Sequence, residues 1–64
     1  MISNKIKELR IKMNLNLSES SEKIGISPTL LFYLESGRNK PTLETIKKIC
    51  IAYKVSADWL LDLK

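Results

Sequence analysis

The chain has 64 residues, a net charge of +4, a single cysteine and no histidine. These values fit one domain, residues 1–64. They exclude an internal disulfide, a four-ligand zinc site and a histidine-dependent hydrolytic triad, so no enzyme activity, metal or cofactor is expected. The positive charge is compatible with a polyanionic partner such as nucleic acid.

The first predicted helix spans Ser3–Met13, with Ser3 as its N-cap and Asn14 at its end. Four side chains share one face at helical spacing: Ile6, Leu9, Arg10 and Met13. The second predicted helix spans Leu17–Ile24. The preceding Asn16, with a glutamate three residues later, resembles a capping box.

The third predicted helix follows at once and runs from Pro28 to Ser36, with Ser27 as its N-cap and proline at the first helical position. Leu31 and Leu34 lie on one side. The opposite side carries Thr29, Phe32, Tyr33 and Ser36.

A polar loop then leads to a fourth predicted helix, which has Thr42 as its N-cap and extends to Tyr53. Its apolar stripe comprises Leu43, Ile46, Ile49, Cys50 and Tyr53, and its opposite side carries Lys47, Ile51 and Lys54. Ser56 caps a final predicted helix, Ala57–Leu63.

The second and third helices are joined by the short turn Gly25-Ile26-Ser27. A turn of this length containing glycine makes two helices cross steeply, so the second helix can project one face into a major groove. The same geometry is also compatible with any small helical bundle.

Several stretches of the chain, at consistent spacing, resemble the phage repressors of the lambdoid repressor and Cro type and related bacterial regulators. They are Ile6-Lys7-Glu8-Leu9-Arg10, Glu22-Lys23-Ile24-Gly25-Ile26-Ser27, Leu34-Glu35-Ser36-Gly37-Arg38, Pro41-Thr42-Leu43-Glu44-Thr45 and Val55-Ser56-Ala57-Asp58-Trp59-Leu60-Leu61. The resemblance implies an all-α, compact, five-helix, lambda-repressor-like domain that binds operator DNA, usually as a homodimer. It also implies a structural ion pair between Arg10 and Glu35.

On this resemblance the third helix reads the bases of double-stranded DNA through Pro28, Thr29, Phe32 and Tyr33. None of these residues is an arginine, asparagine or glutamine, so the face favours thymine methyl groups and groove shape over guanine contacts. The alternative is that Phe32 or Tyr33 folds back onto the domain or meets a protein partner.

The resemblance places DNA phosphates at the start of the second helix and at the loop after the third. The candidate contacts are Asn16, Ser18, Ser27, Ser36, Arg38, Asn39 and Lys40. Leu17 stands where the family often has a phosphate-binding glutamine, so that contact is expected to be missing. The alternative for Arg38–Lys40 is a solvated turn.

Ser20 stands where the family usually has a core leucine, and the lost volume could be filled by Phe32, Met13 or Leu17. Dimer contacts are expected near the last helix, or else the same side chains serve the core. The candidates are Ile51, Ala57, Trp59 and Leu63.

The sequence therefore predicts a sequence-specific DNA-binding transcriptional repressor of phage or prophage type. The alternative is a protein-interaction module on the same fold, anchored by Leu30, Phe32 and Tyr33. The lone Cys50 and the lack of a signal peptide or membrane-spanning run indicate the cytoplasm and no membrane partner. No small-molecule ligand is evident.

Overall fold

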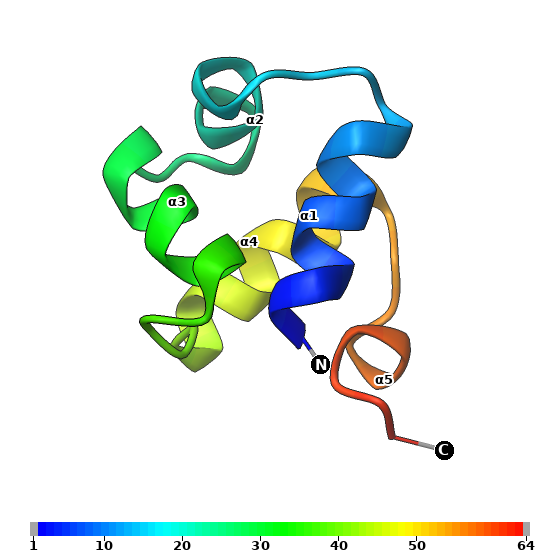
Figure 1. Ribbon diagram of the computed structural model, residues 1–64. Helices are drawn as coiled ribbons and strands as arrows, with labels where there is room; N and C mark the ends of the chain where they lie inside the picture. Colours follow the sequence, from blue (N-terminus) through cyan, green and yellow to red (C-terminus); the bar gives the residue numbers. More distant parts are fainter. Residues whose placement is uncertain (1, 64) are drawn as a thin grey trace.

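The computed structural model describes residues 2–63, which form five α-helices joined by short turns (Figure 1). The helices are α1 (Ile2–Lys12), α2 (Leu17–Ile24), α3 (Pro28–Ser36), α4 (Leu43–Tyr53) and α5 (Ala57–Leu60). In Figure 1, α3 lies at the left of the molecule and α5 at the right, with α1 and α4 between them. The predicted all-α, five-helix fold class is confirmed.

Four of the predicted N-caps are confirmed: the side chains of Asn16, Ser27, Thr42 and Ser56 each accept the backbone N–H three residues later. At α2 the capping box is complete. Asn16 Oδ1 accepts the Glu19 N–H at 2.7 Å, and Glu19 Oε1 accepts the Asn16 N–H at 2.9 Å. These bonds satisfy N–H groups that have no partner inside a helix.

The predicted bounds of the first and last helices are wrong. α1 already begins at Ile2, so Ser3 is a buried helical residue beside the turn at Gly37 and caps nothing. α1 stops at Lys12, and Met13 lies exposed beyond it instead of on the buried face. α5 ends at Leu60, not Leu63, because Asp62 adopts a left-handed conformation with φ of 61°.

All five helices end in the same way. A residue in the left-handed region turns the chain, and the next N–H bonds back to a carbonyl five residues earlier, as between Val55 and Cys50 at 3.1 Å. The left-handed residues are Asn14, Gly25, Gly37, Lys54 and Asp62. Glycine suits this conformation, but lysine and aspartate adopt it against a steric penalty.

Lys54→Gly is expected to raise the free energy of unfolding by about 0.5–1 kcal/mol, because glycine has no Cβ to conflict with the left-handed backbone. Urea denaturation measures the change. Lys47→Gly is the matched control, because Lys47 is an equally exposed lysine within the same helix. This control should lose about 0.5–1 kcal/mol, and equal losses in both variants would contradict the assignment of strain to Lys54.

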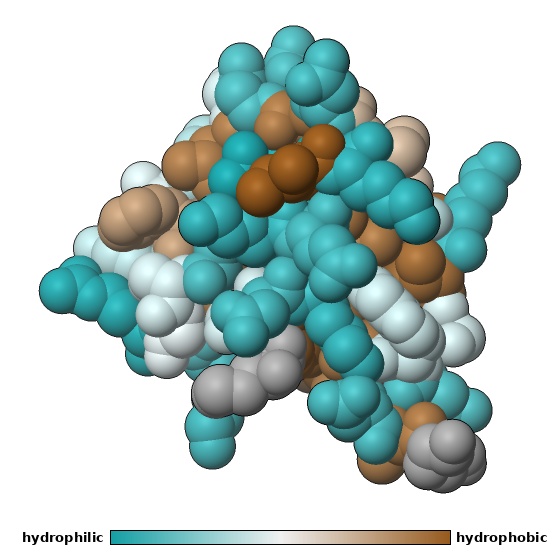
Figure 2. All heavy atoms as spheres, turned by 45° about the vertical axis from the view of Figure 1, so that its right-hand side comes forward, coloured by the Kyte–Doolittle hydropathy of each residue, from teal (hydrophilic) through white to brown (hydrophobic). Residues whose placement is uncertain are grey.

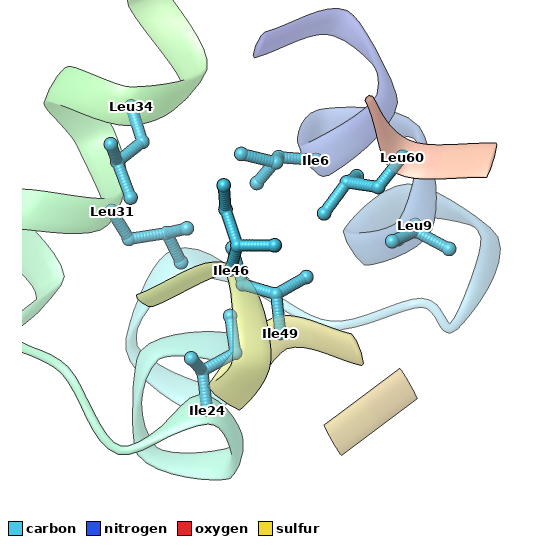
Figure 3. Close-up of a cluster of buried hydrophobic side chains, with 8 residues drawn as sticks. All are labelled: Ile6, Leu9, Ile24, Leu31, Leu34, Ile46, Ile49 and Leu60. Atoms are coloured by element: carbon cyan, nitrogen blue, oxygen red, sulfur yellow. The ribbon is translucent and has the colours of Figure 1, made fainter. Parts of the chain in front are cut away.

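The core is a single cluster to which every helix contributes, as Figure 3 shows. Its buried members are Ile6, Leu9, Ile24, Leu31, Leu34, Ile46, Ile49 and Leu60. Leu43 was predicted to join them but is 73% exposed, because the first turn of α4 projects past the cluster. Ile51, predicted to lie on the outer side, is 77% exposed.

Ser20 is contacted by a residue of α4 that was not among those predicted to fill the space beside it. Ser20 is only 1% exposed, and its hydroxyl pairs with the Tyr53 hydroxyl, which reaches across from α4. Phe32 and Met13, proposed to fill this space, are both about half exposed, while Leu17 packs at the edge of the core. A hydroxyl pair thus stands where an apolar contact was expected.

Candidate nucleic-acid interface

The position of α3 is fixed by the turn that precedes it and by its inner face. Gly25 ends α2 with φ of 95°, and its N–H and that of Ile26 both bond to the Ser21 carbonyl. Leu31 and Leu34 then bury the inner side of α3 in the core. Because those two leucines anchor the helix, its opposite side is held facing outward.

The outer side of α3 presents the residues predicted to contact bases. Pro28 and Thr29 are exposed, Phe32 is 52% exposed and Tyr33 is half-buried. The rings of Phe32 and Tyr33 lie 5.9 Å apart between centroids, and neither belongs to the core cluster. Leu30 packs partly against the core instead of joining this face.

The loop after α3 is tied to the last turn of that helix. The N–H groups of Arg38 and Asn39 both donate to the Tyr33 carbonyl, at 3.0 and 3.3 Å. The Arg38 guanidinium carbon lies 5.4 Å from the centroid of the Tyr33 ring, a cation–π distance. Arg38 and Tyr33 were predicted as separate contacts, whereas the structure brings them together across the turn at Gly37.

The polar residues predicted to contact phosphate differ in how free their side chains are. The oxygens of Asn16 and Ser27 accept capping N–H groups, and the Ser36 hydroxyl donates to the Tyr33 carbonyl at 3.1 Å. The others are exposed, and within residues 2–63 their side chains make no hydrogen bond or ion pair: Ser18, Arg38, Asn39 and Lys40. The loop is therefore the part of this surface with the most unengaged donors.

Arg10 and Glu35 form a bidentate ion pair beneath the interface. Arg10 Nε donates to Glu35 Oε2 at 2.8 Å, and Nη2 donates to Oε1 at 3.0 Å. Nη1 donates to the Leu15 carbonyl, which holds the turn between α1 and α2. The hydrogen bonds to Glu35 raise the pKa of Arg10. With side chains 16% and 6% exposed, the two charges are largely removed from water.

The basic residue Lys5 of α1 faces α5. Its ammonium lies 2.6 Å from Asp62 Oδ1 and 4.9 Å from the centroid of the Trp59 ring, and it also donates to the Trp59 carbonyl. The hydrogen bond from Lys5 lowers the pKa of Asp62. Lys5 is thus engaged on the side of the molecule that bears α5.

The residues predicted for dimer contacts all lie at the surface. Ile51 and Leu63 are strongly exposed, Ala57 is exposed, and Trp59 is partly covered by Lys5. Figure 2, with this side turned forward, shows separate hydrophobic patches in a largely hydrophilic surface. Cys50 packs against the core, and burial raises the pKa of its thiol.

Residues 2–63 contain neither a cluster of metal-binding side chains nor a membrane-spanning helix. No group of three or more histidine, cysteine, aspartate or glutamate side chains is placed there to hold a metal ion. No helix in that range is long and apolar enough to cross a membrane.

Comparison with known proteins adds two findings. Residues 6–60 match the family described as helix-turn-helix. Over 55 residues the chain is 36% identical to the cryptic phage CTXphi transcriptional repressor RstR of Vibrio cholerae, an alignment that covers 86% of this chain and 50% of that protein. The chain thus spans about half the length of this relative.

Proposed function

Because this chain belongs to the phage repressor and Cro-type helix-turn-helix family, we propose that it binds operator DNA and represses transcription by blocking polymerase. The observation that carries the proposal is the outward side of α3, which is anchored from behind and continuous with a basic loop. A protruding helix beside positive charge is the arrangement that enters a major groove.

In this proposal the outer side of α3 contacts base edges, and the exposed donors around it contact phosphates. Phe32 offers only apolar contact, which suits thymine methyl groups. Lys40 and Asn39 lie just beyond the helix, and Ser18 lies near the start of α2. The free N–H groups and dipole at that helix start add to the attraction for phosphate.

The protein would occupy its operator as a homodimer, in which two copies of α3 reach successive major grooves. A two-fold symmetric site with half-sites about one helical turn apart would match such a dimer. Trp59 and Leu63, in or just after α5, and Ile51 in α4 are exposed apolar side chains available for the contact.

DNA affinity is expected to fall steeply with salt, and Lys40→Ala should reduce the slope of log K against log salt by about 1, because one phosphate contact is lost. Fluorescence anisotropy with labelled duplex DNA measures the slope over about 50 to 200 mM salt, a range in which phosphate contacts change the affinity strongly. Lys12→Ala is the control, since Lys12 is exposed and lies beside Val55 and Trp59, on the side of α5. It removes the same charge and should leave the slope unchanged.

A second candidate function rests on the exposed Phe32 ring. Aromatic residues at the centre of a patch also anchor protein partners. Absence of DNA binding even at low salt, together with capture of a partner protein that Phe32→Ala abolishes, would replace the repressor proposal with this one.

A further inference from the structure

The outer side of α3, here called the recognition face, lacks a side chain suited to reading guanine. Thr29, Phe32 and Tyr33 provide apolar contacts and single hydroxyls, but no side chain on the outer side of α3 offers two parallel N–H donors. A guanine is read most often by such a pair of donors, meeting its O6 and N7 atoms. The nearest group of this kind belongs to the loop, at Arg38.

Arg38 is held against the recognition face by both backbone and side chain. Its N–H bonds to the Tyr33 carbonyl at 3.0 Å, and its guanidinium stacks over the Tyr33 ring at 5.4 Å. Gly37, with φ of 82°, makes the turn that brings the two residues together. An arginine fixed on a ring loses less freedom when it binds than one that moves freely.

The N–H groups of the Arg38 guanidinium have no hydrogen-bond partner within residues 2–63. Within residues 2–63 Arg38 takes part in no ion pair. Glu35, an acidic residue in the last turn of α3, is already bound to Arg10. Its N–H donors are therefore available to a ligand. The centroid of the Tyr33 ring also lies 5.9 Å from that of the Phe32 ring. The apolar surface of Phe32 and the paired N–H donors of Arg38 are therefore both next to Tyr33.

We propose that Tyr33 and Arg38 act as one unit, in which the Tyr33 ring positions the Arg38 guanidinium to read a guanine next to thymines contacted by Phe32. This inference rests on the proposed DNA-binding function and assigns a base contact to a residue that the sequence alone placed at a phosphate. Arg38 is the specificity-determining residue, and Tyr33 is a positioning residue.

The test is selection of preferred sites from random duplex DNA, followed by affinity measurements on the chosen site and on variants of its G·C pair. The wild-type protein should prefer guanine at one position of each half-site by roughly 5- to 150-fold. Arg38→Gln replaces the guanidinium by an amide that pairs with adenine instead, so the preference for guanine at this position should vanish.

Two variants at Tyr33 separate its ring from its hydroxyl. Tyr33→Phe keeps the stack and should retain the guanine preference, whereas Tyr33→Leu should lose it although Arg38 is present. Lys40→Ala is the matched control, because it should weaken binding at every site and leave the preference intact. Circular dichroism on each variant establishes that it is folded.

A guanine preference unchanged in Arg38→Gln, with or without a change in salt slope, would overturn the inference and make Arg38 a phosphate contact. Equal loss of preference in Tyr33→Phe and Tyr33→Leu would overturn the positioning role of the ring. If the folded wild-type protein binds no DNA at low salt, the proposed function fails as well, so the two failures are distinguishable.

Discussion

Arg10→Ala is expected to lower the free energy of unfolding by about 3–5 kcal/mol, because it leaves the carboxylate of Glu35 buried without its partner. Glu35 is 6% exposed and receives two hydrogen bonds from Arg10, so little water can replace them. A domain of this size has a total stability of roughly 3–10 kcal/mol. The variant should therefore lose a large part of its stability and unfold at a clearly lower temperature, as thermal denaturation would show.

The double variant Arg10→Met with Glu35→Leu gives the matching contrast. Replacing both charges by apolar side chains of similar size should be nearly neutral, because no uncompensated charge remains. Lys48→Ala is the surface control, since Lys48 lies 4.0 Å from Glu44 at an exposed site and should change stability by about 0.5 kcal/mol or less. A double variant as unstable as Arg10→Ala would contradict this account.

Tyr53→Phe is expected to destabilise the domain by about 1–3 kcal/mol, because it leaves the buried Ser20 hydroxyl without a hydrogen-bond partner. Ser20→Ala with Tyr53→Phe removes both hydroxyls, so the double variant should lose less than the sum of the two single variants. Urea denaturation of all four proteins measures this coupling.

Ser21→Ala is the control for this cycle. Ser21 is as buried as its neighbour, but its hydroxyl donates to the Ser18 carbonyl within the same helix. Its removal leaves no distant group unpaired, so the change should be within about 0.5 kcal/mol. A strictly additive Ser20–Tyr53 cycle would show that the hydroxyl pair contributes nothing to stability.

Local features of the fold were predictable from the sequence because their causes are local. The caps Asn16, Ser27, Thr42 and Ser56 each act on an N–H three residues away, so spacing alone identifies them. Ser3 fits the same pattern and was misassigned, because α1 already begins at Ile2.

Periodicity also misplaced residues at helix ends. Leu43 and Met13 have the spacing of a buried stripe, but Leu43 lies in a first turn that extends beyond the core and Met13 lies just after the end of α1. Periodicity predicts the direction in which a side chain points around the helix axis. It does not predict how far the packed core extends along that axis. The same limit hid the shortening of α5, which depends on the backbone conformation of Asp62.

The candidate site was predictable in outline, through the turn at Gly25 and the apolar pair Leu31 and Leu34 that orients α3. The Arg38–Tyr33 stack was not, because it requires a guanidinium to return over a ring five positions earlier. The sequence holds one indication of it: Gly37 lies between them, and a left-handed residue at a helix end turns the chain back onto the last turn.

The junction between α1 and α5 has a consequence for how the protein is made. Leu60 completes the core, and Lys5 bonds to Asp62, so the earliest and latest helices depend on each other. A nascent chain still holding residues 57–62 in the ribosome tunnel has four helices around an open apolar side. Because Leu60 is part of the one core cluster, we expect the helix-turn-helix unit to reach its full stability only after α5 has emerged.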